Sequence, residues 1–142
     1  MARIIMIGTR KGGEGKTTTL VNLSFELSQM NHRVLVLDMD GQAHATKYFK
    51  RLDTELFLGD LLLNRKFDIN KVIYPAIVNG QEQANLHIIP SRKGDAMSKL
   101  DINMISLPKR EERLTRHLEK IKDDYDLVSG WKKKRFDPIT KT

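Results

Sequence analysis

A glycine-rich segment with two lysines and two threonines, residues 11–18, carries the residue types that bind phosphate. It reads Lys-Gly-Gly-Glu-Gly-Lys-Thr-Thr and stands between an apolar run, residues 4–7, and leucines at helical spacing. Glycines let backbone N–H groups approach a polyphosphate, and a helix start adds unpaired N–H groups and a positive dipole end. Lys16 can reach the β- and γ-phosphates, and the Thr17 hydroxyl can bind Mg²⁺. The segment predicts a nucleoside triphosphate site; the structural alternative is a tight turn without a ligand.

The elements around this segment alternate between strand and helix, which favours an α/β fold with a doubly wound, mostly parallel sheet. Continuous apolar runs are typical of strands covered on both faces. Strands are expected at 3–8, 33–38, 86–90 and 125–128, and helices at 15–30, from Thr54 and from Ser106. The first helix is expected to bury Leu20, Leu23, Leu27 and Met30 and to stop at Asn31; the last has Leu114, Leu118 and Ile121 on one face, with Glu112 and Arg116 paired across a turn. Asn79-Gly80 predicts a turn, and 65–84 is otherwise mixed.

Two aspartates follow the second predicted strand. Asp38 ends the apolar run 33–38, and Asp40 comes two residues later. Ligands bind at the carboxyl ends of parallel strands, so these carboxylates are expected at the same sheet edge as the phosphate loop. Asp38 has the alternative of capping the segment that follows, and Asp40 that of an ordinary loop acid.

Composition restricts the class of protein. The 142 residues are 39% hydrophobic and 30% charged, without a run of about 20 apolar residues and without a signal-peptide cleavage region. The absence of cysteine excludes disulfides and thiolate metal sites, and the four histidines show no metal spacing and are expected to be ordinary surface or strand residues. A cytoplasmic protein is expected. Most of the net charge of +7 lies in residues 129–142, where a solvated end is the alternative to a nucleic-acid patch.

The sequence resembles the deviant Walker A ATPases of the ParA/MinD group, most closely the ParA/Soj partition ATPases. The resemblance is carried by the loop, by the strand that ends in Asp-x-Asp-x-Gln, and by three later stretches, 58–62, 85–91 and 123–128. The resemblance covers residues 2 to about 128 and implies a P-loop NTPase-like fold, of which only the N-terminal part is present. It implies ATP and Mg²⁺ as cofactors. It also implies an ATP-dependent homodimer and a ParB-like stimulator. No membrane partner is expected, because residues 129–142 have too few apolar residues for an amphipathic membrane helix. The loop glycines that it implies are Gly12, Gly13 and Gly15.

Roles for individual residues follow from the same resemblance. Lys11 matches the signature lysine that reaches the partner's phosphates across the dimer, and Lys16 matches the in-chain phosphate lysine. Thr17 matches the Mg²⁺ ligand, and Thr18 would contact the α-phosphate. Asp40 matches the aspartate that positions the attacking water, and Asp38 would lie near the Mg²⁺ hydration shell.

Three features depart from the family pattern. Glu14 brings a negative charge into the loop, and Gly41 stands where partition ATPases usually have proline. From Ser129 onward a glycine and a run of four basic residues replace an apolar strand, so residues 1–128 are interpreted as an incomplete ATPase domain and 129–142 as an off-pattern basic tail. A truncated or out-of-frame end is the hypothesis for this tail.

Three functions remain open from the sequence. The first is an ATPase in plasmid or chromosome partition, and the second is a non-catalytic fragment that binds nucleotide or a partner ATPase without turnover. The third is direct nucleic-acid binding through the basic run 132–135. Non-specific DNA is a possible partner by the resemblance, but the basic surface that partition ATPases use on DNA belongs to the missing half. Relatives with cysteine-ligated clusters, a C-terminal membrane helix or a tyrosine-rich tail fit less well, because the chain has none of these features.

Overall fold

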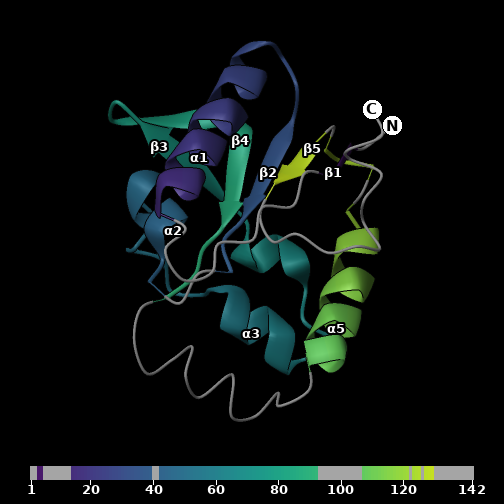
Figure 1. Ribbon diagram of the computed structural model, residues 1–142. Helices are drawn as coiled ribbons and strands as arrows, with labels where there is room; N and C mark the ends of the chain where they lie inside the picture. Colours follow the sequence, from purple (N-terminus) through teal and green to yellow (C-terminus); the bar gives the residue numbers. More distant parts are fainter. Residues whose placement is uncertain are drawn as a thin grey trace.

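The computed structural model contains a five-stranded sheet with helices on both faces (Figure 1). It describes residues 3–4, 14–39, 42–92, 107–121, 123–125 and 127–129. The strands are β1 (Arg3–Ile4), β2 (Val34–Leu37), β3 (Tyr74–Val78), β4 (Gln81–Ile89) and β5 (Leu127–Ser129). The helices are α1 (Glu14–Gln29), α2 (His44–Tyr48), α3 (Leu58–Leu63), the 3₁₀ helix η1 (Ile69–Val72) and α5 (Leu107–Glu119).

The sheet is mostly parallel, as the sequence predicts. Its strand order is β1-β5-β2-β4-β3. The pairs β1–β5, β5–β2 and β2–β4 are parallel, and the pair β4–β3 is antiparallel. The predicted first strand, 3–8, is described only at Arg3–Ile4. The predicted last strand is present as β5, which runs through Ser129. Residues 130–142 lie outside the described part, so the interpretation of the tail stays a prediction.

Side chains of β2 alternate between two hydrophobic clusters, one on each face of the sheet. Leu35 and Leu37 belong to the cluster built with α3, η1 and α5, whereas Val34 and Val36 belong to the cluster built with α1, α2 and β3. All four are at most 3% exposed. A strand buried on both faces must be continuously apolar, which explains why β2 is recognisable in the sequence.

Helix α1 confirms the predicted extent but not the predicted buried face. Leu23 and Met30 are 44% and 67% exposed, so the expectation that they are core residues is wrong. The buried positions are instead Val21, Ser24 and Ser28, at 2–3% exposure. The serine hydroxyls donate to carbonyls of their own helix, to Leu20 at 2.8 Å and to Phe25 at 2.6 Å. Small side chains that satisfy their own polar atoms can face the sheet, and a leucine pattern cannot reveal them.

The stop at Asn31 is confirmed by its backbone. Asn31 has a left-handed φ of 67°, its N–H donates to Ser28 O, and the N–H of His32 donates to Leu27 O. These two bonds form the Schellman motif that closes helices at a left-handed residue. The chain thus leaves α1 and enters β2 three residues later.

The region 65–84, for which the sequence gives no clear pattern, contains most of a β-hairpin. Asn79 and Gly80 have φ values of 53° and 78° and join Val78 to Gln81, which are paired across the hairpin. Two consecutive positive φ values in a two-residue loop are typical of a type I′ turn. The turn was predicted, but β3 and the first part of β4 were not.

The last predicted helix is confirmed as α5. Leu114, Leu118 and Ile121 are at most 2% exposed, and Arg116 pairs with Glu112 at 2.7 Å. The helix expected from Thr54 begins later, at Leu58, after the N–H of Phe57 donates to Asp60 Oδ2 at 2.9 Å. Among the described residues, no helix combines the length and apolar character that crossing a bilayer requires.

Candidate functional site at the carboxyl edge of the sheet

The carboxyl ends of β1, β5, β2 and β4 define one edge of the sheet because these strands are parallel. The chain between β1 and α1 contains the predicted phosphate loop, and β2 ends immediately before Asp38. Gly15, Lys16 and Thr17 lie in the first turn of α1, which begins at Glu14. Thr18, in the same helix, is exposed. The structure therefore describes the strand before the predicted loop and the helix after it.

Several predicted site residues lie outside the described part of the chain. These are Lys11, Gly12, Gly13 and Asp40, together with Gly41 among the departures. Their roles stay predictions.

Asp38 is buried at the end of β2, with 3% of its surface exposed. Its N–H donates to Ile89 O at 3.2 Å, which continues the pairing with β4 by one residue. Its carboxylate Oδ2 accepts two hydrogen bonds from Thr46, one from the backbone N–H at 2.9 Å and one from the hydroxyl at 2.6 Å. Hydrogen bonds to an ionised oxygen are about twice as strong as neutral ones.

The contact with Thr46 agrees with the capping interpretation of Asp38. Thr46 is the third residue of α2, and the first N–H groups of a helix have no partner within it. Helix α2 begins after Ala43, a residue in the left-handed conformation whose side chain offers no cap. Asp38 thus supplies from β2 the acceptor that the residue before α2 lacks. The predicted role near Mg²⁺ is compatible with this contact and is not tested by it.

Thr46 connects Asp38 to the exit of β4. Its side chain is fully buried, and its hydroxyl oxygen accepts from the N–H of Ser91 at 2.8 Å while donating to Asp38. Ser91 is 3% exposed. Because a hydroxyl has one hydrogen, the donation to Asp38 and the acceptance from Ser91 fix its orientation.

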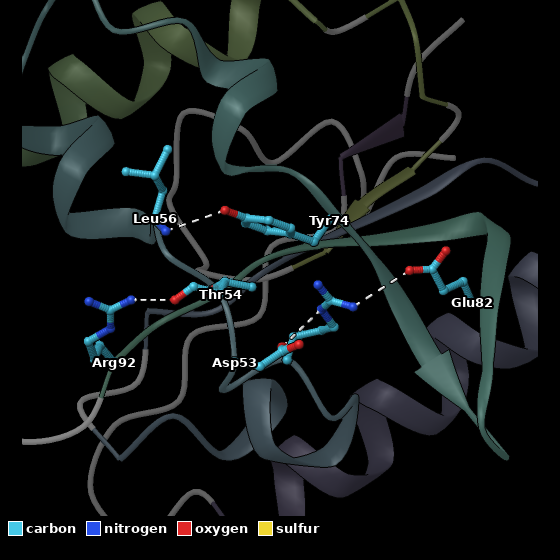
Figure 2. Close-up of polar contacts among 7 residues, drawn as sticks. Asp53, Thr54, Leu56, Tyr74, Glu82 and Arg92 are labelled. Carbon is cyan, nitrogen blue, oxygen red and sulfur yellow. Dashed lines mark hydrogen bonds and ion pairs between the residues drawn. The ribbon is translucent and has the colours of Figure 1, made fainter.

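The two residues around Ser91 hold the segment that follows α2. Pro90 O accepts from the N–H of Leu58, the first residue of α3, at 2.8 Å. Arg92 donates from Nη2 to Thr54 O at 2.7 Å, as Figure 2 shows, and to Glu55 O at 3.2 Å. Its guanidinium also lies 4.4 Å from the centroid of the Phe57 ring. Three consecutive residues after β4 therefore contact α2, the loop 49–57 and α3.

The loop 49–57 is also fixed from the hairpin. The N–H of Leu56 donates to Tyr74 Oη at 3.3 Å (Figure 2). The guanidinium of Arg51 lies 5.3 Å from the centroid of the Tyr74 ring. Arg51 pairs with Asp53 at 3.4 Å and with Glu82 at 3.8 Å. The Arg51 side chain is 12% exposed, whereas both acids are more than half exposed. The aromatic contact and the buried stem of Arg51 thus add more than the pairs themselves.

The donor set at this edge fits a Mg²⁺ ion that is shared with phosphates. The described residues contain no group of three or more histidines, cysteines or acids that could hold a metal alone. A nucleotide-bound Mg²⁺ needs only one or two protein oxygens, because phosphates and waters complete its shell. One buried carboxylate, Asp38, and one hydroxyl residue in the first turn of α1, Thr17, match that requirement in chemistry.

The titratable pair His87 and Tyr125 lies away from this edge. His87 lies in β4, two residues before its end and opposite Leu35, and its Nδ1 is 2.8 Å from Tyr125 Oη. Burial lowers the pKa of His87 and raises the pKa of Tyr125 to about 12. His117 was expected at the surface or in a strand, but it is 1% exposed and lies in α5. Both histidines belong to the α3 and α5 side of the sheet.

Thr46 and Arg92 are the residues of this edge that sequence reasoning did not single out. Thr46 stands eight residues after Asp38 in a segment without a clear pattern, and Arg92 follows the recognised stretch 85–91. The only signal was that the recognised stretch ends at Ser91, the residue before Arg92.

Comparison with known proteins adds three kinds of match. A family model described as an AAA domain matches residues 2–129. The chain is 35% identical over 130 residues to the sporulation initiation inhibitor protein Soj of Bacillus subtilis, covering 90% of this chain and 48% of Soj. The solved structure of the septum site-determining protein MinD with Mg-ADP from Pyrococcus horikoshii is 30% identical with a TM-score of 0.67, covering 91% of this chain and 48% of MinD.

A plasmid partition protein from Borrelia burgdorferi is 28% identical with a TM-score of 0.67, covering 91% of this chain and 55% of that one. The matches confirm the predicted P-loop NTPase-like fold. The chain spans about half the length of the curated relatives that it matches.

Proposed function

We propose, from the membership of the chain in the AAA domain family and, within it, in the ParA/MinD-type P-loop ATPases, a function in nucleotide binding. In this proposal the chain binds ATP with Mg²⁺ at the carboxyl edge of its sheet. In this proposal the loop glycines Gly12, Gly13 and Gly15 cradle the phosphates. Lys16 and Thr18 contact them, and Thr17 and Asp38 serve the Mg²⁺. Bound Mg²⁺ would neutralise phosphate charge.

The observation that carries the proposal is the buried Asp38 at the sheet edge where β1 also ends. Strands β1 and β2 both pair in parallel with β5, so the carboxyl end of β1, which precedes the predicted phosphate loop, and the carboxyl end of β2, which precedes Asp38, lie at the same edge. Asp38 is buried there and held by Thr46, which keeps a carboxylate in place without exposing it to bulk water. Preorganised charge of this kind is what phosphoryl transfer requires from a protein.

Nucleotide binding is tested by titrating the 142-residue chain with a fluorescent ATP analogue, with and without Mg²⁺. We expect Mg²⁺-dependent binding that Lys16→Ala weakens by about tenfold or more, corresponding to about 1.4 kcal/mol. Lys71→Ala is the matched control, because Lys71 is an exposed lysine in η1 on the α3 side of the sheet. Binding that neither Mg²⁺ nor Lys16→Ala affects would contradict the proposal.

Turnover and assembly are the finer part of the proposal. We propose Mg²⁺-dependent ATP hydrolysis coupled to homodimerisation, in which Lys11 reaches the partner's phosphates and Asp40 positions the attacking water. The cellular role would be plasmid or chromosome partition in the cytoplasm, with a ParB-like protein as stimulator. Loss of phosphate release in Asp40→Ala, with binding retained, is the expected result.

The second candidate function is nucleotide binding, or binding to a partner ATPase, without turnover. It is supported by the extent of the matches, which cover 48% of Soj and 48% of the Pyrococcus horikoshii MinD chain. Tight binding without phosphate release in the wild-type chain would select this candidate over hydrolysis.

A further inference from the structure

Thr46 uses its hydroxyl differently from the other buried hydroxyls of the helices. Ser24 and Ser28 in α1 donate to carbonyls three or four residues back in their own helix, as hydroxyls in helices commonly do. Thr46 instead donates to Asp38 in another element, at 2.6 Å, and accepts from Ser91 in a third. Its hydroxyl is therefore committed to joining the ends of β2 and β4.

We infer that Thr46 is a positioning residue for Asp38 and, through it, for the Mg²⁺ of a bound nucleotide; this inference rests on the proposed function. Thr46 itself is fully buried and contacts Asp38 from the side of α2. Groups that orient a carboxylate near a metal change metal affinity by about 10- to 100-fold when they are removed.

Three properties make Thr46 suited to this task. The β-branched side chain has few rotamers in a helix, so its hydroxyl is held in direction. The hydroxyl and the N–H of the same residue both donate to one oxygen of Asp38, which restrains rotation of the carboxylate. Full burial keeps bulk water from replacing either bond.

The exit of β4 fixes Thr46 in turn. The N–H of Ser91 donates to the Thr46 hydroxyl. On either side of Ser91, Pro90 O accepts from the N–H of Leu58, and Arg92 donates to the carbonyls of Thr54 and Glu55. Movement of the β4 exit would therefore be transmitted to Asp38 through the Thr46 hydroxyl. Because coupling between two sites is reciprocal, Mg²⁺ at Asp38 should in turn stabilise the bond between Thr46 and Ser91.

The test compares Thr46→Val, Thr46→Ser and Ser28→Ala in the 142-residue chain. Thr46→Val keeps the shape and the N–H but loses the hydroxyl, Thr46→Ser restores the hydroxyl, and Ser28→Ala removes a buried hydroxyl that bonds only within α1. The readouts are the Mg²⁺ concentration that half-saturates binding of a fluorescent ADP analogue and the thermal unfolding of each nucleotide-free variant.

We expect Thr46→Val to raise the half-saturating Mg²⁺ concentration about tenfold or more, and Thr46→Ser and Ser28→Ala to stay within about twofold of wild type. If Thr46→Val lowers thermal stability but leaves the Mg²⁺ dependence unchanged, the role of Thr46 is structural and the inference is overturned. The proposed function is not affected by that result. Wild-type protein that binds no nucleotide with Mg²⁺ would instead overturn the proposed function and this inference together.

A measurement on wild-type protein guards against a Thr46→Val variant that fails to fold. Amide hydrogen exchange at Thr46 and Ser91 is compared between ADP with Mg²⁺ and ADP with EDTA. Slower exchange at both amides with Mg²⁺ supports the coupling, and equal exchange in the two conditions overturns it.

Discussion

His117 is a buried ionisable side chain with one unsatisfied nitrogen. Its ring is 1% exposed between Leu114 and Leu118 on α5, and its Nδ1 has no hydrogen-bond partner within the described residues. Burial lowers its pKa, and nearby Lys120 lowers it further, against hydrogen bonds with the backbone of Asn64 and Leu61 that raise it. The neutral ring is therefore the form that suits the folded protein.

The lowered pKa of His117 predicts a loss of stability in weak acid. The unfolded chain takes up the proton near pH 6.5, whereas the folded protein takes it up only at lower pH, so the free energy of unfolding falls as the pH drops below about 6.5. We expect the difference in unfolding free energy between wild type and His117→Gln to shrink from about pH 7.5 to about pH 5. Urea unfolding at several pH values measures it. A difference that is constant with pH would contradict the assignment.

At the scale of single residues, the sequence predicts candidate side chains for binding phosphate and Mg²⁺. It does not predict the residues that hold those side chains in position. Asp38 is recognisable because it ends an apolar run in a recognised spacing. Thr46 is not recognisable, because its contact with Asp38 exists only in the folded chain, where α2 lies beside the end of β2. His117 shows the same limit, since its burial depends on the packing of α5 against α3.

At the scale of elements, α1 shows why a leucine pattern can give the helix and miss its buried face. The sheet accepts Val21, Ser24 and Ser28, while Leu23 and Met30 remain exposed. Periodicity identifies apolar side chains, but close contact between a helix and a sheet also admits small polar ones whose hydroxyls bond to the helix.

A pair of substitutions in α1 tests this face. Ser28→Leu should destabilise the protein by about 1–3 kcal/mol, because it forces a large side chain into a packed contact. Met30→Ser should change stability by less than about 0.5 kcal/mol, because Met30 is 67% exposed. Chemical unfolding of both variants measures the difference. The reverse order of effects would restore the leucine face as the buried one.

The hairpin of β3 and β4 carries a prediction about its turn. Gly80 has a φ of 78°, and a Cβ added there would meet nothing within 4 Å, so the cost of Gly80→Ala is conformational rather than steric. We expect a loss of about 1–2 kcal/mol in the free energy of unfolding. Gln81→Ala, at an exposed position beside the turn, is the control and should lose less than about 0.5 kcal/mol. Equal losses in the two variants would refute the conformational explanation.

At the scale of the whole molecule, β2 and β4 join the two hydrophobic clusters. Leu35 faces one cluster and Val36 the other, and β4 contributes Ile88 and Ile89 to opposite sides in the same way. The alternation of buried strands and helices was enough to predict this arrangement. The hairpin partner β3 was not predictable, because Tyr74–Val78 contains a proline and has no strict alternation of apolar and polar residues.

Shared strands predict cooperative unfolding. Disrupting one cluster should weaken the other, so thermal unfolding followed by circular dichroism should show a single transition. Leu35→Ala, at a position with 0% exposure, should lower the free energy of unfolding by about 2–5 kcal/mol and keep the transition single. Two separated transitions would show that the clusters fold independently.

The outer edge of β3 has a consequence for self-association. Pro75 has no backbone N–H to donate. The N–H of Ile77, two residues later in β3, donates to Phe49 O at 3.0 Å and not to a neighbouring strand. The pairing register between β3 and β4 also shifts between Pro75 and Ile77, which makes the strand irregular there. A second chain could not extend the sheet at β3 by regular strand pairing, because the donors that it would need are absent or already used. The protein thus has, on this side, a built-in barrier to edge-to-edge aggregation.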